Sequence, residues 1–150
     1  MRIWIDADAC PRPVRDIVFK RAEKKALRVT LVANSFQRTP PVGWIDFVQV
    51  PAGMDEADHY IAAHVQPADL VITQDVPLAA DVVGIGATAV SVRGELWTED
   101  NVREHLSIRD FMTEARALGV TTGGPPPFDS RARQAFANAF DRWLAGVAAR

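Results

Sequence analysis

Short hydrophobic runs alternate along this chain with segments of helical periodicity. The first run, residues 3–5, is β-branched and aromatic and ends in two acids, which predicts a buried strand. Further runs predict strands over 28–33, 47–50, 69–73 and 88–92. Apolar residues at helical spacing predict helices over 11–25, from a cap near Asp55 to about 65, and over 78–83. This alternation is typical of an α/β fold with a mainly parallel sheet.

The remainder of the chain has helical spacing only. Thr98 is expected to cap a helix to about residue 106, and a second helix is expected to reach Leu118, with Gly119 just beyond it. A loop is predicted over 121–128, where three prolines follow two glycines. The last helix has an apolar stripe formed by Ala132, Phe136, Phe140, Trp143, Leu144 and Val147. These C-terminal helices are therefore expected to cover the sheet.

Length and composition favour one globular domain, with a core over about 1–95 and a helical part over about 98–150. The chain has 150 residues, of which 48% are hydrophobic and 24% charged. Its single cysteine, Cys10, excludes an internal disulfide and fits a reducing cytoplasm. No apolar stretch reaches the length of a membrane span, and no signal peptide is recognisable. We therefore expect a cytoplasmic protein without a membrane partner.

Charge is unevenly distributed, although the formal net charge is only −2. Residues 12–28 contain seven basic side chains: Arg12, Arg15, Lys20, Arg21, Lys24, Lys25 and Arg28. Residues 39–92 contain no lysine or arginine, but seven acids. Two interpretations remain open: solvated surfaces of opposite charge, or a phosphate-binding rim beside a metal site.

Acidic residues gather where strands are expected to end. Asp6 and Asp8 follow the first strand, Asp55 and Asp58 lie in the first turn of a helix, and Asp75 follows the strand 69–73. In a right-handed parallel sheet these positions share one edge. Carboxylates gathered there would bind Mg²⁺ or Mn²⁺, which supports metal-dependent phosphodiester hydrolysis. The principal predicted catalytic ligands are Asp6, Asp58 and Asp75, with Asp8 in support; the alternative is that one aspartate merely caps a helix.

These acids also resemble those of a known group of enzymes. Asp6 after the first strand, Glu56-Ala57-Asp58 at a helix start and Ile72-Thr73-Gln74-Asp75 at a strand end resemble the PIN-like nucleases. This resemblance implies a PIN-like three-layer fold and a divalent-metal nuclease, with RNA favoured over DNA as the partner.

A narrower resemblance covers nearly the whole chain. It is carried by IWIDADACP from residue 3, LVANS at 31–35, EADHYI at 56–61, DLVITQDVPLAA at 69–80, VRGE at 92–95, RDFM at 109–112 and TGGP at 122–125. These segments resemble the YaiI/YqxD family of uncharacterised bacterial proteins. Two positions depart from the related patterns: Pro77 replaces an acid common in PIN-like nucleases, and Ala132-Arg133 replaces an Asp-Arg pair. The first departure predicts a weak or missing second metal, and the second predicts a lost cap or salt bridge.

Other polar residues are candidates for substrate binding. Asn34 and Ser35 follow the second strand and could bind phosphate or ribose, or form an ordinary turn. Arg93 is the first cation after the stretch 39–92 and is a candidate phosphate clamp. Arg12 and Arg15 lie on the predicted basic helix and are candidates to bind a polyanion such as a nucleic acid.

Rival functions follow from the same residues. A catalytically weak module would hold RNA or a nucleotide through Arg12, Arg15, Lys20 and Arg93. A dehalogenase-like phosphatase would phosphorylate the first aspartate, but the last lysine is Lys25, so Arg93 would have to replace the usual downstream lysine. A cysteine phosphatase loop is excluded because the spacing from Cys10 to Arg15 is one residue too short. Cys10 is then a small residue at a helix start.

Overall fold

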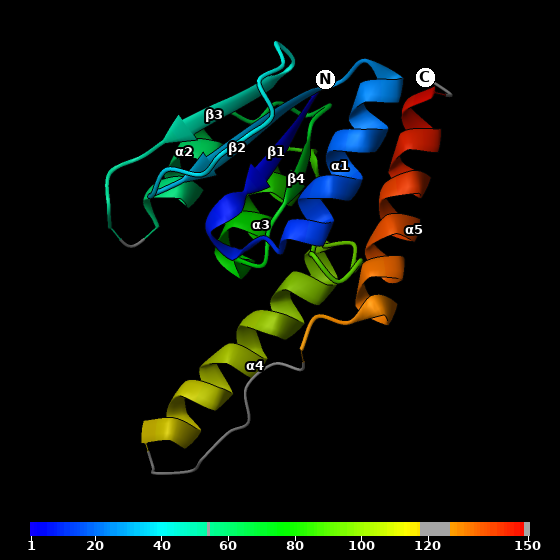
Figure 1. The fold of residues 1–150 in the computed structure, drawn as a ribbon. Helices are drawn as coiled ribbons and strands as arrows, with labels where there is room; N and C mark the ends of the chain where they lie inside the picture. The colour runs from blue at the N-terminus through cyan, green and yellow to red at the C-terminus, as the bar shows by residue number, and fades with distance from the viewer. Residues whose placement is uncertain (54, 118–126, 149–150) are drawn as a thin grey trace.

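The fold is seen in a computed structural model that describes residues 1–53, 55–117 and 127–148 (Figure 1). Its strands are β1 (Arg2–Asp6), β2 (Arg28–Ala33), β3 (Ile45–Gln49), β4 (Leu70–Ile72) and β5 (Thr88–Val90). Its helices are a short 3-10 helix η1 (Ala7–Ala9), then α1 (Arg12–Lys25), α2 (Glu56–His64), α3 (Val76–Gly84), α4 (Glu99–Ala117) and α5 (Ser130–Ala148).

The five strands form one parallel sheet in the order β3-β2-β1-β4-β5. In this register Asp6 pairs with Val32 of β2, and Ile5 pairs with Ile72 of β4. The carboxyl ends of the three central strands therefore meet at one edge, and the predicted α/β fold with a parallel sheet is confirmed.

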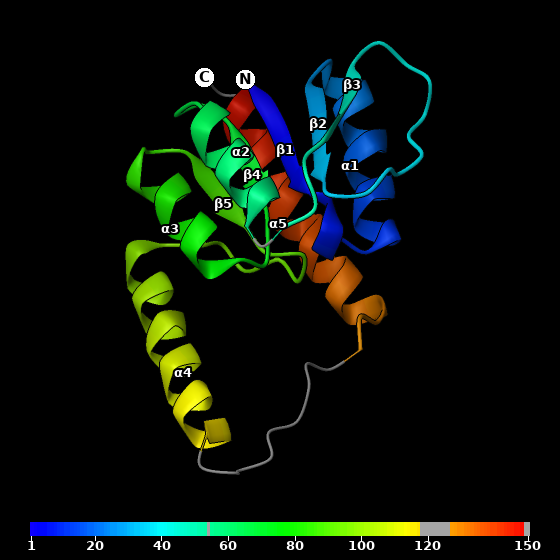
Figure 2. The ribbon, with the colours of Figure 1, turned by 90° about the vertical axis from the view of Figure 1, so that its left-hand side faces the viewer.

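Helices cover both faces of the sheet and make three layers (Figures 1 and 2). On one face, apolar residues of α1 and α5, including Val18, Phe136 and Phe140, pack against Ile3 and Ile5. On the opposite face of the sheet, residues of α2 and α3 pack against side chains of the same strands. This second cluster includes Trp4, Ile61, Val71, Leu78 and Val82. Strand β1 contributes to both clusters because successive side chains of a strand point to opposite faces.

Proline positions and capping hydrogen bonds explain where several helices begin and end. Pro11 and Pro13 lie at the start of α1, where a missing amide hydrogen costs nothing. That helix ends at Ala26, whose left-handed φ of 55° lets its amide bond back to Ala22 and Glu23. Thr98 caps α4 as predicted, because its hydroxyl accepts a hydrogen bond from the amide of Asn101 at 3.2 Å.

One expectation about the helices is wrong, and another falls mostly outside the described residues. The segment predicted as two helices between Thr98 and Leu118 is one continuous helix, α4, as far as Ala117. No glycine or proline occurs in this segment to end a helix, so the hydrogen-bond ladder continues. Residues 118–126, which hold Gly119 and most of the loop expected over 121–128, lie outside the described residues.

One glycine fixes how the connection after strand β5 meets α5. Gly94 has φ of +86°, and a Cβ at this position would come within 2.4 Å of the carbonyl oxygen of Ala135. The backbone of this turn therefore touches the backbone of α5 directly, which only glycine permits.

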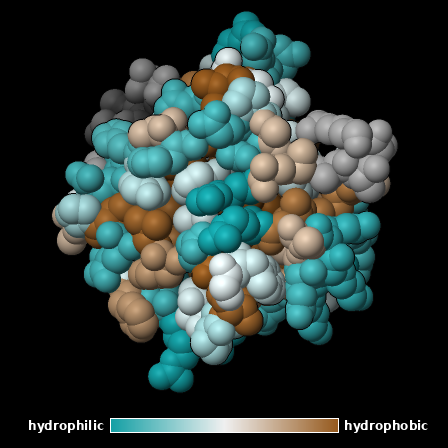
Figure 3. Space-filling view, turned by 90° about the horizontal axis from the view of Figure 1, so that it is seen from above, coloured by the Kyte–Doolittle hydropathy of each residue, from teal (hydrophilic) through white to brown (hydrophobic). Residues whose placement is uncertain are grey.

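The strands begin at the upper end of the molecule in Figure 1 and point away from it. Figure 3 looks onto that upper face, where hydrophilic side chains surround small separate hydrophobic patches. Among the described residues no helix combines the length and the apolar character needed to cross a membrane. The acidic residues described next lie at the opposite, carboxyl end of the strands.

Candidate functional site

Asp6 and Asp75 are linked through one threonine at the carboxyl edge of the sheet. Asp6 ends β1 and is only 7% exposed. The Thr73 hydroxyl, at the end of β4, donates to Asp6 Oδ2 at 3.0 Å and accepts from the amide of Asp75 at 2.9 Å. Thr73 therefore links the Asp6 carboxylate to the backbone amide of Asp75.

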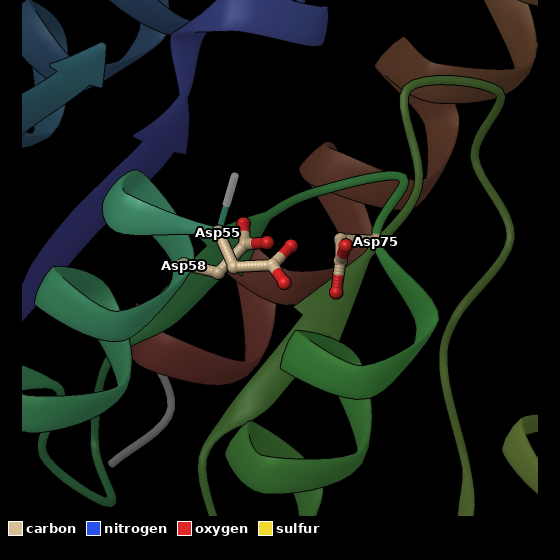
Figure 4. A group of neighbouring side chains, drawn as sticks. All are labelled: Asp55, Asp58 and Asp75. Carbon is tan, nitrogen blue, oxygen red and sulfur yellow. The ribbon is translucent and has the colours of Figure 1, made fainter. Parts of the chain in front are cut away.

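Three carboxylates form a tighter group beside this pair (Figure 4). Carboxylate oxygens of Asp55, Asp58 and Asp75 all lie within 4.8 Å of one another. In Figure 4 the carboxylates of Asp55 and Asp58, at the start of α2, face that of Asp75 at the start of α3. Segments far apart in the chain thus bring oxygen ligands to one point.

Local structure sets the direction of these side chains. Asp75 is the N-cap of α3, and its Oδ1 accepts a hydrogen bond from the amide of Leu78 at 2.8 Å. Asp55 occupies the N-cap position of α2 with a left-handed φ of 65°, yet its side chain makes no capping hydrogen bond. The expectation that Asp55 caps the helix is thus correct for the backbone and wrong for the carboxylate, which joins the acidic group instead.

Burial and neighbouring negative charge raise the pKa of two of these acids. Burial raises the pKa of Asp6 above its usual range, and the negative charges of Asp75 and Asp8 raise it further, while the Thr73 hydrogen bond opposes them. Burial, the charges of Asp6 and Asp75, and a hydrogen bond to Asp75 raise the pKa of Asp58 to about 8. Near neutral pH the cluster therefore holds a proton.

Two cavities open onto these acids. The larger, of about 260 Å³, is called the acidic pocket and is lined by Asp6, Asp8, Asn34, Gly53, Asp55, Glu56, Ala57 and Asp58. The smaller, of about 120 Å³, is called the outer cavity and is lined by Asp55, Asp58, His59, Asp75, Pro77, Leu78 and Asp81. Asp55 and Asp58 line both cavities, so the acids form one continuous surface.

Asp8 has a different environment from the other predicted ligands. It lies on η1, is exposed, and accepts hydrogen bonds from the amide of Asn34 at 3.0 and 3.3 Å. Asp8 and Asn34 therefore form the rim of the acidic pocket. Ser35 is exposed beside Asn34 but does not line either cavity in the described part of the chain.

The predicted basic residues separate into two places. Arg12 and Arg15 line a third cavity of about 440 Å³, called the arginine groove, together with Asp16, Phe19, Arg38, Thr39, Pro40 and Pro41. Arg93 instead lies near the start of α5, with its guanidinium carbon 5.9 Å from the centre of the Phe128 ring. Among the residues lining the acidic pocket and the outer cavity in the described structure, Arg93 is absent.

Sequence patterns overlooked several residues of this region. Thr73, Gln37 and Arg38 were not predicted to contribute, although a threonine two residues before an acid at a strand end is a usable signal for Thr73. Ala132 has no side chain that could cap or form a salt bridge, and its amide instead donates to Asp129 Oδ1 at 2.9 Å, so Asp129 caps the last helix. Burial raises the pKa of the Cys10 thiol to about 12, which agrees with the exclusion of a cysteine phosphatase.

The fold and the acids define a class of three-layer α/β protein with a carboxylate-rich cleft where its parallel strands end. Residues 4–146 match the family described as "Uncharacterized BCR, YaiI/YqxD family". The chain belongs to this family, as its sequence motifs predicted.

Relatives support the same assignment. A UPF0178 protein of Xanthomonas campestris pv. campestris strain 8004 is 54% identical over 149 residues, covering 99% of this chain and 93% of the relative. A UPF0178 protein of Shewanella baltica strain OS155 is 52% identical over 146 residues, or 97% of each chain. No solved structure gave a significant match to the chain.

Proposed function

We propose that this protein is a divalent-metal-dependent phosphodiester hydrolase that acts on nucleic acid, with RNA favoured over DNA. The observation that carries the proposal is the approach of Asp55, Asp58 and Asp75 to within 4.8 Å beside the buried Asp6. Acids at corresponding places in the sequence pattern are the basis of the resemblance to PIN-like nucleases, and membership of that superfamily is part of this proposal.

The donor set fits Mg²⁺ or Mn²⁺. All the candidate ligands are carboxylate oxygens, which these hard cations prefer, and no sulfur or imidazole belongs to the three-residue group. We assign Asp6, Asp58 and Asp75 as principal ligands, with Asp8 at the rim and Asp55 as an addition from the structure. A cation held there would activate a water molecule and neutralise charge on a phosphate.

The chain's own residues would prepare this site in three ways. Thr73 orients the Asp6 carboxylate and the backbone of Asp75. The amide of Leu78 fixes Asp75 from the other side. The raised pKa of Asp58 couples cation binding to the release of a proton near neutral pH, so binding would strengthen as pH rises.

One observation favours a second candidate, a module that binds RNA or a nucleotide without efficient catalysis. Pro77 lines the outer cavity two residues after Asp75, where PIN-like nucleases commonly have another acid. With one carboxylate fewer, the outer cavity would bind a second cation more weakly. A small-molecule phosphatase is the least favoured alternative.

The proposal is tested by titrating Mn²⁺ calorimetrically into chelator-treated protein and then assaying RNA and DNA oligonucleotides for cleavage. We expect saturable binding and metal-dependent cleavage, both lost in Asp6→Asn. Asp100→Asn is the matched control, because it removes the same charge at an exposed position on α4.

Three other outcomes are informative. RNA binding without cleavage in Mn²⁺ would favour the binding module. Hydrolysis of simple phosphomonoesters but not of oligonucleotides would indicate a phosphatase. An unchanged cleavage rate in Asp6→Asn would refute the proposed site.

A further inference from the structure

The arginine groove lies next to the acidic pocket and is tied to it by hydrogen bonds. Gln37 donates from Nε2 to the carbonyl oxygen of Ala7 at 3.2 Å, and Ala7 directly follows Asp6. The same side chain accepts from Arg15 Nη1 through Oε1 at 2.6 Å. A continuous set of contacts therefore runs from the end of β1 to the arginine groove.

The loop between β2 and β3 carries residues of both cavities. Asn34 at its start lines the acidic pocket, and Arg38, four residues later, lines the arginine groove. This loop runs beside α1 (Figure 2). Its hydrogen bonds at Asn34 and Gln37 attach it to η1 at two points, so the loop connects residues of both cavities to η1.

The groove has a positive surface. Arg12 and Arg15 lie one helical turn apart on α1 and line the groove together with Arg38 and a single acid, Asp16. Arg12 and Arg38 are exposed and have no hydrogen bond or ion pair to another described residue. Since the whole chain has a net charge of −2, this is a local positive surface on an acidic protein.

An exposed aromatic residue, Phe36, lies in the chain between Asn34 of the acidic pocket and Arg38 of the arginine groove. Phe36 is 76% exposed, and its ring rests edge-on against Phe47, with 5.8 Å between ring centres. Phe47 packs against the hydrophobic cluster on the face of the sheet that α1 covers, and Phe36 directly precedes Gln37, whose side chain is bonded to Arg15 of the groove. An exposed aromatic ring that is supported on one side and is close in the chain to arginines offers a surface on which unpaired bases stack.

We propose that the arginine groove and Phe36 bind single-stranded nucleic acid, with backbone phosphates on Arg12, Arg15 and Arg38 and an unpaired base on Phe36. The direction of the strand, from the groove across η1 to the acidic pocket, rests on the proposed function. Binding itself does not require that function. A paired duplex cannot offer a base face to Phe36, so single strands are preferred over duplexes.

The test is fluorescence anisotropy with a labelled single-stranded RNA oligonucleotide in EDTA, where no cation-dependent chemistry occurs. We expect Arg12→Ala/Arg38→Ala to weaken binding at least about tenfold. The slope of log affinity against log salt should fall by about 0.7 for each phosphate that the variant no longer neutralises. The matched control is Lys24→Ala/Lys25→Ala, which removes the same charge from the other end of α1.

The aromatic contribution is tested separately. Phe36→Ala should weaken binding about fivefold or more with an unchanged salt slope, and Phe36→Tyr should restore it. Single-stranded DNA of the same sequence distinguishes the two nucleic acids, and annealed duplexes of each should bind more weakly.

Clear results would overturn the inference. It fails if the double arginine variant binds like the lysine control, or if duplexes bind as tightly as single strands. If the groove binds RNA as expected but metal-dependent cleavage is absent, the hydrolase proposal fails while this inference stands.

Discussion

The acidic pocket includes Asp8 of η1 and the arginine groove is linked to η1 through Gln37, yet the two are built in opposite ways. The principal acids are partly or fully buried and close together, so the pKa values of Asp6 and Asp58 are raised. The arginines of the groove are mostly exposed. Two of them lie on α1, and Arg38 comes from a loop that is attached to Arg15 through Gln37. In the acidic pocket, burial and repulsion between carboxylates destabilise their charged forms. In the arginine groove, the exposed guanidinium groups stay hydrated, so their charge costs little free energy. The two regions should therefore respond differently to mutation, pH and metal.

The largest effect on stability is expected from Thr73→Val. This change removes the hydroxyl that Asp6 and the Asp75 amide share, and leaves a buried carboxylate without that partner. We expect a loss of about 2–3 kcal/mol in the free energy of unfolding, measured by urea titration at neutral pH. Thr88→Val is the control, because Thr88 is half-buried on β5 and makes no side-chain hydrogen bond to another described residue. Equal stability of both variants would contradict the role of Thr73.

The next effect is a dependence of stability on pH in chelator. The pKa of Asp58 is about 8 in the folded protein, against 3.8 ordinarily, so the folded state keeps a proton that the unfolded state releases. This contribution is fully present below about pH 4 and is lost as pH rises towards about 8. After allowance for solvent screening at a half-exposed group, we expect a fall of about 1–2 kcal/mol over that range.

Two variations sharpen the pH experiment. Asp58→Asn should remove most of the fall, because the amide does not titrate. Saturating Mn²⁺ should also reduce it, since a bound cation replaces the proton. A stability curve that rises between about pH 5 and 8 in chelator would contradict the crowding of these acids.

A smaller effect is expected at the connection between the two regions. Gln37→Ala removes hydrogen bonds to Ala7 and Arg15 and should lower stability by about 1 kcal/mol. RNA affinity in EDTA should fall, because Arg15 and the loop lose their support, whereas Mn²⁺ affinity should stay unchanged. Anisotropy and calorimetry on one preparation check both. Equal losses in both affinities would show that the regions are a single unit.

The smallest effect is expected at the rim. Asp8 is exposed and already accepts hydrogen bonds from Asn34, so Asp8→Asn should change Mn²⁺ binding by less than about 1 kcal/mol. Calorimetry beside Asp58→Asn gives the comparison. A complete loss of binding in Asp8→Asn would move Asp8 from the rim to the principal ligands.

Sequence patterns predicted most of the fold because the strands are buried on both faces. Continuous apolar runs such as residues 70–72 have no other stable place in a domain of this size. Strand β3 was placed two residues late because Asp46 interrupts its apolar pattern and pairs with Arg28 at the sheet edge. The break expected near residue 106 is absent, because no glycine or proline lies between Thr98 and Ala117 to end the helix.

Only those residues of the candidate site whose positions follow from the sheet topology could be predicted from the sequence. Asp6, Asp58 and Asp75 converge because parallel strands end at one edge, and no detailed contact is needed to foresee this. Arg93 follows β5 at the same edge, but the turn through Gly94 leads toward α5, so its guanidinium reaches Phe128. Gln37 and Arg38 lie in a loop whose path depends on long-range hydrogen bonds, which periodicity does not encode.

The position of α5 has a consequence for the order in which the protein folds. All five strands precede α5 in the chain, yet Phe136, Phe140 and Leu144 of α5 cover part of one sheet face. During synthesis that part of the face stays exposed to water, and to other chains, until α5 leaves the ribosome. The vulnerable period of this protein is therefore the interval between completion of the sheet and arrival of α5, when aggregation and chaperone capture compete with folding.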